Sequence, residues 1–251
     1  MFIPSLRTHS VLHRRVASVK SWTRRFTTET QTKDAIRRLL RETAQPVAVV
    51  TSILDIDDRH NASPDCIPPG RAHPFHGATL SSFSSIALDP HPLVSFSLRI
   101  PSRLAVSLKA YKERQRSDTH MVVNILSCQQ QDVAVRFSRA DIYEDPFKDT
   151  EYHLTDDGLP VLTGSLGALT CSLVQCIPLH ELCTSEVHTH KMGDRGVISE
   201  LFISRVLRVE DTRRPNDASP LLYHHREYAS AQLLKPLAPP LDKRYVPSTL
   251  R

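Results

Sequence analysis

The chain has 251 residues, of which 40% are hydrophobic and 24% charged, and this composition is typical of a globular protein rather than a disordered or collagen-like one. It has no run of 18 apolar residues, so we expect no helix that crosses a membrane and no membrane partner. The net charge of +5 would indicate a nucleic-acid-binding protein only if that charge lay on the folded body.

The positive charge is concentrated at the start of the chain. Residues 1–28 contain no Asp or Glu and carry six basic residues, namely Arg7, Arg14, Arg15, Lys20, Arg24 and Arg25. Without these six, the chain has 26 basic and 27 acidic residues, a net charge of −1. A nearly neutral body offers no basic face to a phosphate backbone, so we expect no nucleic-acid partner.

An acid-free opening rich in Arg, Ser and Thr is typical of an organelle presequence. A secretory signal would need an unbroken apolar core, and here charged residues interrupt every apolar run. Arg24 and Arg25 before Phe26 resemble a mitochondrial processing site that leaves Thr27 as the new first residue. We therefore predict that residues 1–28 are a transit peptide and that the mature protein lies in the mitochondrial matrix; a disordered basic tail is the alternative.

The cysteines do not indicate a disulfide framework or a structural zinc site. They are odd in number and form no CxxC pair: Cys66, Cys128, Cys171, Cys176 and Cys183. We expect them to be small apolar groups in a reducing compartment.

The predicted elements are mostly short strands. The first is a helix over 33–40, with Thr32 as its N-cap and Pro46 beyond its end. The elements that follow are a strand at 46–54, an inserted polar loop at 55–73, two strands between 75 and 98 around an Asp89–Pro92 turn, a helix at 103–111, a strand at 120–126, a helix at 129–137, a mostly irregular segment at 139–160, and strands at 166–177 and 199–210. This order predicts one mainly β domain, a closed or nearly closed antiparallel barrel with a few short helices.

The usual phosphate-binding and hydrolase motifs are absent: GxGxxG, GxxxxGK[ST], GxSxG and HExxH do not occur. With only seven glycines, the chain has little from which to build a glycine-rich phosphate loop. A Rossmann dinucleotide domain is therefore excluded.

The most informative segment is Gly77–Pro90, where five hydroxyls fall within seven residues: Thr79, Ser81, Ser82, Ser84 and Ser85. Hydroxyls and backbone amides at this density can donate to a phosphate or to the carbonyl edge of a flat heterocycle. Taken alone, the segment favours a Ser-rich turn that caps its own backbone over a ligand site.

The order of motifs resembles the flavin reductase-like family, the FMN-binding split barrels. The matching segments are G-x-T-x-S-S-F-S-S-x-x-L-x-P from Gly77, Pro92–Leu98 leading to Ser102 and Arg103, Val122–Ser127, Gln130–Phe137, Gly158–Leu162, Leu201–Val206 and Pro220–Tyr223 with Tyr228. The resemblance runs from about Leu39 to Tyr228 and implies a Greek-key split barrel over residues 32–230, with a tail at 231–251. With its acid-free opening segment, the chain is identified as a mitochondrial member of this family, of the fungal type.

The resemblance implies a set of cofactor contacts. Thr79, Ser81 and Ser82 would contact the isoalloxazine and ribityl chain of FMN. Ser85, Ser102 and Arg103, with Arg99 a further candidate, would hold the FMN phosphate. Asn124 would either approach the flavin or pair with neighbouring backbone.

The implied activity is NAD(P)H-dependent reduction of flavin or a small acceptor, by a homodimer that supplies a flavin-dependent monooxygenase partner. The flavin carries the redox chemistry, so no catalytic residue is assigned. Relatives commonly have Gly-Asp-His before the strand Leu201–Val206; here the alignment favoured places Ser199 at the histidine, which makes 178–198 an enlarged hairpin. The alternative function is therefore a flavin-binding or assembly module with little or no turnover.

Two further hypotheses concern histidines. Glu186, His188 and His190 would share one face of a strand as a metal trio, although a solvent-facing polar edge is the more common arrangement, and we therefore assign no metal. His224 or Arg226, in a segment that lacks the family's glycine, would line the cleft, contact the phosphates of a nicotinamide dinucleotide, or lie in a solvated loop.

Overall fold

A computed structural model describes residues 29–54, 74–114, 118–183 and 198–232. The chain divides into two compact units, residues 1–40 and 41–251. In the first unit the described residues form helix α1 (Glu29–Arg41), which runs to the boundary and contains the predicted helix. None of the described helices is long and apolar enough to span a membrane.

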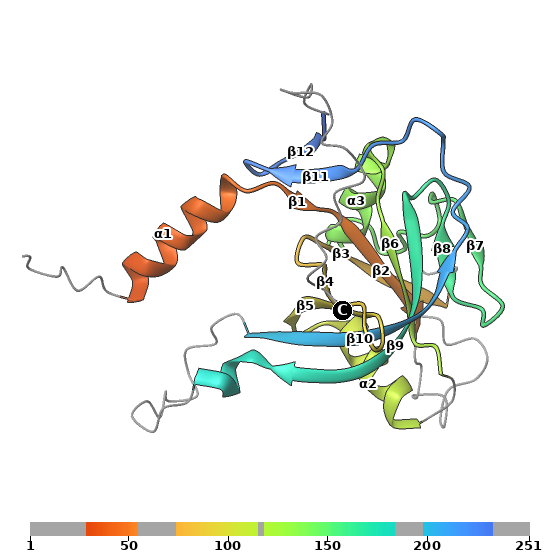
Figure 1. Ribbon diagram of the computed structural model, residues 1–251, viewed down its shortest axis with the longest axis horizontal. Coiled ribbons are helices and arrows are strands. Elements are labelled where there is room, and N and C mark those ends of the chain that lie inside the picture. The colour runs from red at the N-terminus through yellow and green to blue at the C-terminus, as the bar shows by residue number, and fades with distance from the viewer. Residues whose placement is uncertain (1–28, 55–73, 115–117, 184–197, 233–251) are drawn as a thin grey trace, which may run out of the picture. The chain divides into compact units, whose positions relative to one another are not determined.

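The second unit is built on a curled antiparallel sheet of seven strands (Figure 1). Its strands, in spatial order, are β3 (Phe75–Leu80), β2 (Ala48–Ile53), β6 (Met121–Ile125), β9 (Gly167–Pro178), β10 (Ile198–Glu210), β5 (Leu93–Ile100) and β4 (Ser84–Ala87). Strands β3 and β4 form the two edges of this sheet. The predicted mainly β, antiparallel barrel class is confirmed.

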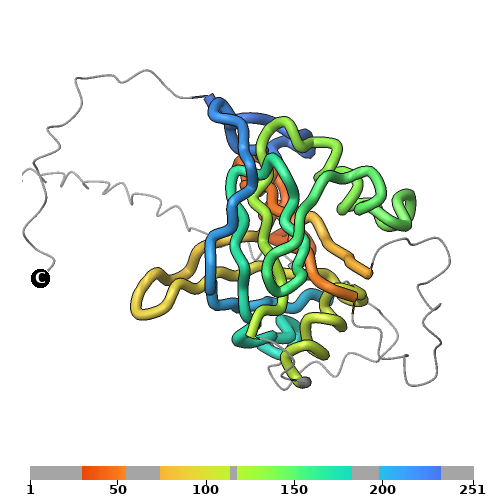
Figure 2. The backbone as a smooth tube through the Cα atoms, turned by 90° about the vertical axis from the view of Figure 1, so that its right-hand side faces the viewer, coloured from red at the N-terminus to blue at the C-terminus, as the bar shows by residue number. Residues whose placement is uncertain are grey.

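Smaller elements decorate the sheet. They are the three-stranded sheet β1 (Gln45–Pro46), β11 (Leu221–His224) and β12 (Glu227–Ser230), the pair β7 (Tyr152–Leu154) and β8 (Pro160–Leu162), helices α2 (Arg103–Arg114) and α3 (Gln131–Ser138), and the 3₁₀ turns η2 (Cys128–Gln130) and η3 (Leu179–Cys183). Figure 2 shows the β4–β5 hairpin projecting from the body of the barrel.

Strand β2 is buried on both faces, which explains why it is rich in β-branched residues and lacks an alternation of apolar and polar side chains. Ala48 and Val50 face the barrel interior, where Phe96 and Phe202 stack with ring centroids 5.5 Å apart. Val47 and Val49 face a second cluster, which includes Phe137 of α3. Each fully buried side chain of this size contributes about 1.5–3 kcal/mol, so the core on both sides of β2 fixes where α2 and α3 lie.

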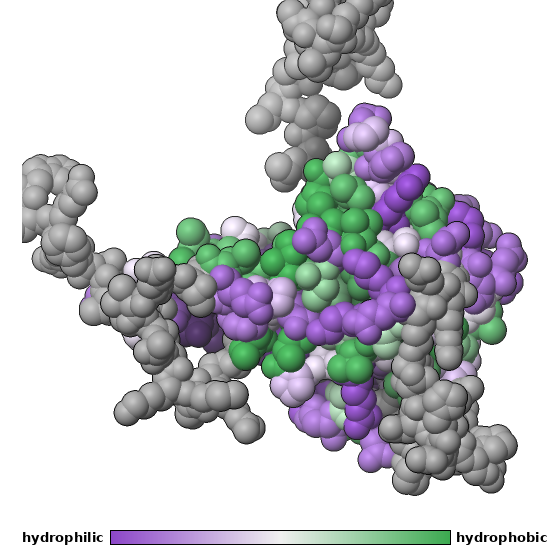
Figure 3. Space-filling view, turned by 90° about the horizontal axis from the view of Figure 1, so that it is seen from below, coloured by the Kyte–Doolittle hydropathy of each residue, from purple (hydrophilic) through white to green (hydrophobic). Residues whose placement is uncertain are grey.

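Apolar side chains also reach the surface, among them Leu88, Val106 and Val209, which are 73%, 64% and 75% exposed. Seen from below, hydrophobic and hydrophilic residues are interspersed over the visible face of the barrel (Figure 3). Scattered exposure of this kind is ordinary in soluble domains, so hydropathy does not single out a docking surface on that face.

Two segments differ from the sequence-based prediction. Residues 75–88 form two strands, because the chain leaves β3 after Leu80 and re-enters the sheet as β4 at the opposite edge. The segment 139–160 is mostly irregular, as predicted, apart from β7 and the first residue of β8. Residues 221–230 form a hairpin whose two-residue turn places His225 and Arg226 at φ of 52° and 70°, the left-handed region that glycine favours.

Several predictions fall on residues outside those the structure describes. They are the transit peptide, the inserted loop 55–73, most of the hairpin 178–198 with its proposed metal trio, and nearly all of the tail 231–251. Among the described cysteine side chains, Cys171 is buried, Cys128 and Cys176 are half-buried, and none forms a disulfide. Burial raises the pKa of the Cys171 thiol to about 12, as expected for a small apolar core group.

Candidate functional site

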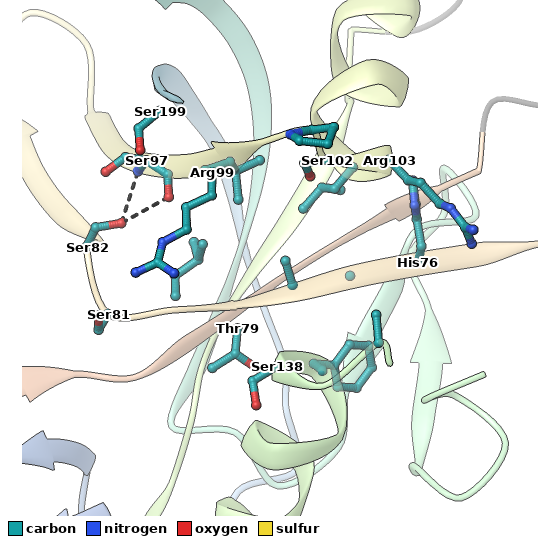
Figure 4. Close-up of a pocket in the computed structure, with 18 of the residues that line it drawn as sticks. His76, Thr79, Ser81, Ser82, Ser97, Arg99, Ser102, Arg103, Ser138 and Ser199 are labelled. Atoms are coloured by element: carbon teal, nitrogen blue, oxygen red, sulfur yellow. Dashed lines mark hydrogen bonds between the residues drawn. The ribbon is translucent and has the colours of Figure 1, made fainter. Parts of the chain in front are cut away.

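A pocket of about 850 Å³ lies in the split of the barrel. Its walls come from β3 and the turn that follows it, the end of β5, the start of α2, and the end of α3 (Figure 4). The pocket exists because β4 pairs with β5 only through Leu93–Ser95, so the last residues of β5 extend beyond β4. The far edge of β3 is likewise unpaired with any described strand, which leaves backbone groups of both strands facing the split.

The structure brings six of the eight predicted cofactor contacts to this pocket. Thr79, Ser81, Ser82, Arg99, Ser102 and Arg103 all line it. The other two, Ser85 and Asn124, do not. The six residues come from three separate elements, so their convergence is a property of the fold rather than of the Ser-rich segment alone.

Thr79 lies on β3 beside the end of α3. Its hydroxyl donates to the carbonyl oxygen of Ala134 at 2.7 Å, which leaves the oxygen lone pairs to accept a hydrogen bond from a ligand. Gly77 makes this close approach possible, because a Cβ there would lie 2.7 Å from the Val50 carbonyl oxygen and 2.9 Å from the Phe137 ring. The glycine therefore allows α3 to form one wall of the pocket.

Ser82 closes the gap between the turn after β3 and strand β5. Its Oγ accepts from the backbone N–H of Ser97 at 3.0 Å and donates to the Ser97 carbonyl oxygen at 3.3 Å (Figure 4). A serine side chain thus replaces the missing β4 partner of Ser97. Ser82 remains exposed, so a ligand can still reach it.

The first turn of α2 forms another part of the wall. Ser102 caps this helix, accepting from the Ala105 N–H at 3.3 Å, and Arg103 follows it. The first turn of α2 holds no acidic residue, so its free N–H groups and partial positive charge are available to an anion. Lys109 fixes the helix by pairing with the Glu200 carboxylate of β10 at 2.9 and 3.1 Å.

Arg99 enters the pocket from β5. The alternation of this strand buries Val94, Phe96 and Leu98. Ser97 and Arg99 therefore project on the opposite face. Across the ladder, Ser199 of β10 pairs with Arg99 and also lines the pocket. Both Arg99 and Arg103 are exposed, and neither forms an ion pair with any described residue.

Among the described residues that line the pocket, Asp141 is the only acidic one. Arg139 binds it with two nitrogens at 2.8 and 2.9 Å, and this hydrogen-bonded pair lowers the pKa of the Asp141 carboxyl. The pair neutralises the carboxylate, so among the residues that the structure describes Arg99 and Arg103 are the charges at the pocket without an ion-pair partner. The pocket therefore favours anionic ligands.

In the structure the Asn124 side chain pairs with neighbouring backbone and does not line the pocket. This side chain is fully buried, and its Nδ2 donates to the Val49 carbonyl oxygen at 3.2 Å and to Thr51 Oγ1 at 3.1 Å. Its Oδ1 accepts from the Leu162 N–H at 2.8 Å. The cofactor assignment of Asn124 is therefore wrong: its amide joins β2, β6 and β8 on the face of the sheet opposite the barrel interior.

Ser85 also falls outside the pocket. It lies on β4, exposed, in register with Val94 of β5. The prediction placed it beside Ser81 and Ser82 on one bend, but the chain moves from one sheet edge to the other between them. Ser85 is thus part of the projecting hairpin.

Sequence reasoning missed four pocket residues: His76, Ser97, Ser138 and Asp141. Ser97 could have been found, since the alternation on β5 places it on the face of Arg99. The other three belong to the start of β3 and the end of α3, and no local pattern marks them. Among the described residues, no group of three His, Cys, Asp or Glu side chains is placed to hold a metal.

A curled antiparallel sheet whose split holds a hydroxyl-lined pocket with two arginines defines a split barrel. The profile of the flavin reductase like domain matches residues 40–232, most of this chain. The chain therefore belongs to the flavin reductase-like family.

Two curated relatives match part of the chain. One is the FMN reductase (NADH) SmoA of Agrobacterium fabrum, 34% identical over 95 residues, which are 38% of this chain and 48% of the relative. The other is a flavin reductase of Pseudomonas putida, 35% identical over 97 residues, which are 39% of this chain and 51% of the relative. This chain thus spans about half the length of the curated relatives it matches.

Solved structures show the same fold at low identity. A homolog of nitrilotriacetate monooxygenase component B from Mycobacterium thermoresistibile aligns with a TM-score of 0.58 and 23% identity, covering 86% of this chain and 96% of that one. BorF, the flavin reductase component of a bacterial two-component tryptophan halogenase, aligns with a TM-score of 0.52 and 21% identity, covering 79% and 97%.

Proposed function

We propose that this protein is an FMN-binding oxidoreductase that uses NAD(P)H to reduce flavin or a small acceptor. The observation that carries the proposal is the pocket in the barrel split, where a free guanidinium and the start of a helix adjoin a row of hydroxyls, in a chain of the flavin reductase-like family. When bound, the flavin supplies the redox chemistry by accepting a hydride from the reduced nicotinamide.

The residues present fit FMN. A phosphate dianion is best held by hydroxyls, free backbone N–H groups and a guanidinium, and Ser102, Arg103 and the first turn of α2 supply all three. Thr79, Ser81 and Ser82 would receive the uncharged ring and ribityl chain. The volume of about 850 Å³ lies within the range of cofactor pockets and exceeds what a single small metabolite needs.

The chain's own contribution would be binding and orientation. Apart from the neutralised Asp141, the ionisable residues that line the pocket are His76 and two arginines. Rate enhancement would come from holding the nicotinamide and flavin rings in contact.

A second candidate is a flavin-binding or assembly module with little turnover. Ser199 favours it, because this serine lines the pocket at the position where the resemblance leads us to expect a histidine. A hydroxyl there cannot provide the ring or the charge of an imidazole.

We extend the proposal to partner and assembly. The chain would act as a homodimer and deliver reduced flavin to a flavin-dependent monooxygenase, in line with the two-component systems named for BorF and the nitrilotriacetate monooxygenase component. Ile86 and Leu88 on the projecting hairpin, 50% and 73% exposed, would lie in the dimer contact.

The proposed location is the mitochondrial matrix, as a member of the fungal type. Its support is the acid-free, Arg-rich composition of residues 1–28. Mass spectrometry of the protein recovered from mitochondria should give Thr27 as its first residue, and an intact Met1 would contradict the presequence.

Anaerobic titration tests the function. Purified protein incubated with FMN should retain a yellow chromophore after gel filtration, and NADH or NADPH should bleach it within seconds to minutes. Retention of FMN without bleaching by either nucleotide would favour the binding module. Failure to retain or bind FMN would overturn both candidates.

A further inference from the structure

The pocket has two separate cationic ends. Along β3 and the turn that follows, His76 and Ser81 are five residues apart, which corresponds to about 16 Å of extended chain. Figure 4 shows Arg103 at the His76 end and the Arg99 side chain extended toward the end that holds Ser81 and Ser82. One guanidinium therefore serves each end.

The Arg99 end is rich in hydroxyl groups. Ser82 and Ser97 are joined by two hydrogen bonds at 3.0 and 3.3 Å, and Ser199 lies opposite Arg99 in the β5–β10 ladder. Ser97 and Ser199 are both half-buried. This set combines a fork of guanidinium donors with nearby hydroxyl donors, which is the chemistry that binds phosphate oxygens.

FMN accounts for only one of these ends. It carries a single anionic group, its phosphate, and its oxidised ring is uncharged. With the phosphate at Ser102 and Arg103, the guanidinium of Arg99 has no anion to bind within the same molecule. A pocket with one neutralised carboxylate and two free guanidinium groups has charge for a second anionic ligand.

Resting on the proposed function, we propose that Arg99, with Ser97 and Ser199 beside it, binds the diphosphate of the nicotinamide dinucleotide. The diphosphate is the only anionic group of NADH. Arg99 is thereby assigned to the second substrate rather than to the flavin phosphate. Arg103 binds FMN, and Arg99 binds the nicotinamide dinucleotide.

The test separates the two ligands with variants Arg99→Gln and Arg103→Gln, with Arg205→Gln as control. Arg205 lies exposed on β10 outside the pocket, so its substitution makes the same change in net charge. FMN dissociation constants come from fluorescence titration. Nucleotide affinity comes from calorimetry of FMN-loaded protein with tetrahydro-NAD, an analogue that cannot transfer hydride, so this reading does not depend on turnover.

We expect Arg99→Gln to weaken the tetrahydro-NAD complex about 10- to 100-fold and to leave FMN affinity within about twofold, since a charge-assisted hydrogen-bonded contact is lost only from the nucleotide. Arg103→Gln should do the reverse, and Arg205→Gln should change neither. Inorganic pyrophosphate should compete with tetrahydro-NAD in the wild-type protein and no longer bind measurably to Arg99→Gln.

Three results would overturn the assignment. Loss of FMN affinity in Arg99→Gln with nucleotide binding unchanged would return Arg99 to the flavin phosphate. A lower flavin midpoint potential with unchanged nucleotide affinity would assign it to the charge of the reduced ring. Unchanged values throughout would show that it binds neither ligand. If wild-type protein does not bind FMN at all, it is the proposed function that fails, and this outcome is distinct from the other three.

Discussion

Two polar clusters on neighbouring strands look alike in the sequence and differ in the fold. Asn124 and Thr51 lie between the sheet and β8 with no exposed surface, and every polar atom of the Asn124 amide is hydrogen-bonded to the protein. Thr79 and Ser82 also bind backbone groups, but they remain within reach of a ligand at the open split. The site residues differ from the scaffold residues because they can still hydrogen-bond a ligand, not because they are more polar.

The largest effect on stability is expected from a substitution in the buried cluster of Asn124 and Thr51. Asn124→Ala removes three hydrogen bonds and leaves the Leu162 N–H buried without its acceptor. We expect the free energy of unfolding to fall by about 3 kcal/mol, measured by urea denaturation, because buried groups without partners each cost on the order of 1–3 kcal/mol. FMN affinity of the folded fraction should not change by more than about twofold. A loss of FMN affinity with stability retained would instead place Asn124 in the site.

A smaller effect is expected where the scaffold forms the site wall. Gly77→Ala places a methyl group 2.7 Å from the Val50 carbonyl oxygen and 2.9 Å from Phe137, so either β3 or α3 must move. We expect a loss of about 1–3 kcal/mol of stability, as for other overpacked positions. Because α3 carries part of the pocket, FMN affinity should fall as well. Gly167→Ala is the control, since a Cβ there meets nothing within 4 Å.

A substitution in the accessible cluster of Thr79 and Ser82 should have the smallest effect on stability. Ser82→Ala removes the partner of the Ser97 N–H at an exposed position, where water can replace it. We expect a loss of about 0.5–1 kcal/mol of stability, together with a several-fold weaker FMN complex. Ser84→Ala, on the exposed hairpin beyond the pocket, should change neither quantity. Equal effects of the two substitutions on FMN affinity would show that Ser82 has no special role.

Much of the fold could be predicted from local patterns. The strand after Pro46, the helix after Ser102 and the long strands near 167–178 and 198–210 follow from β-branched runs, a cap and alternation. The break after Leu80 could not be predicted, because the turn that carries the chain between two sheet edges is decided by pairing with β2 and β5, far away in the sequence. The His225–Arg226 turn was hidden because neither residue favours a positive φ.

The sequence motif predicted pocket residues correctly only where those residues lie along one strand and its following turn or at one helix cap. Thr79, Ser81, Ser82, Ser102 and Arg103 reach the pocket as the motif indicated. Ser85 failed because the motif crosses from one edge of the sheet to the other. Asn124 failed because burial turns a polar residue into a scaffold group. Asp141 and its partner Arg139 come from a turn with no sequence signal, and only the tertiary structure brings them to the rim.

The most direct test of the central claim, that the pocket holds FMN by its phosphate at Ser102 and Arg103, compares FMN with riboflavin. Their dissociation constants are measured for the wild-type protein and for Arg103→Ala. The account predicts that wild type binds FMN more tightly than riboflavin by about 1.5–3 kcal/mol and that Arg103→Ala loses most of this difference, with riboflavin binding unaltered. Equal affinity for the two flavins in the wild-type protein, or a difference that survives the substitution, would contradict it.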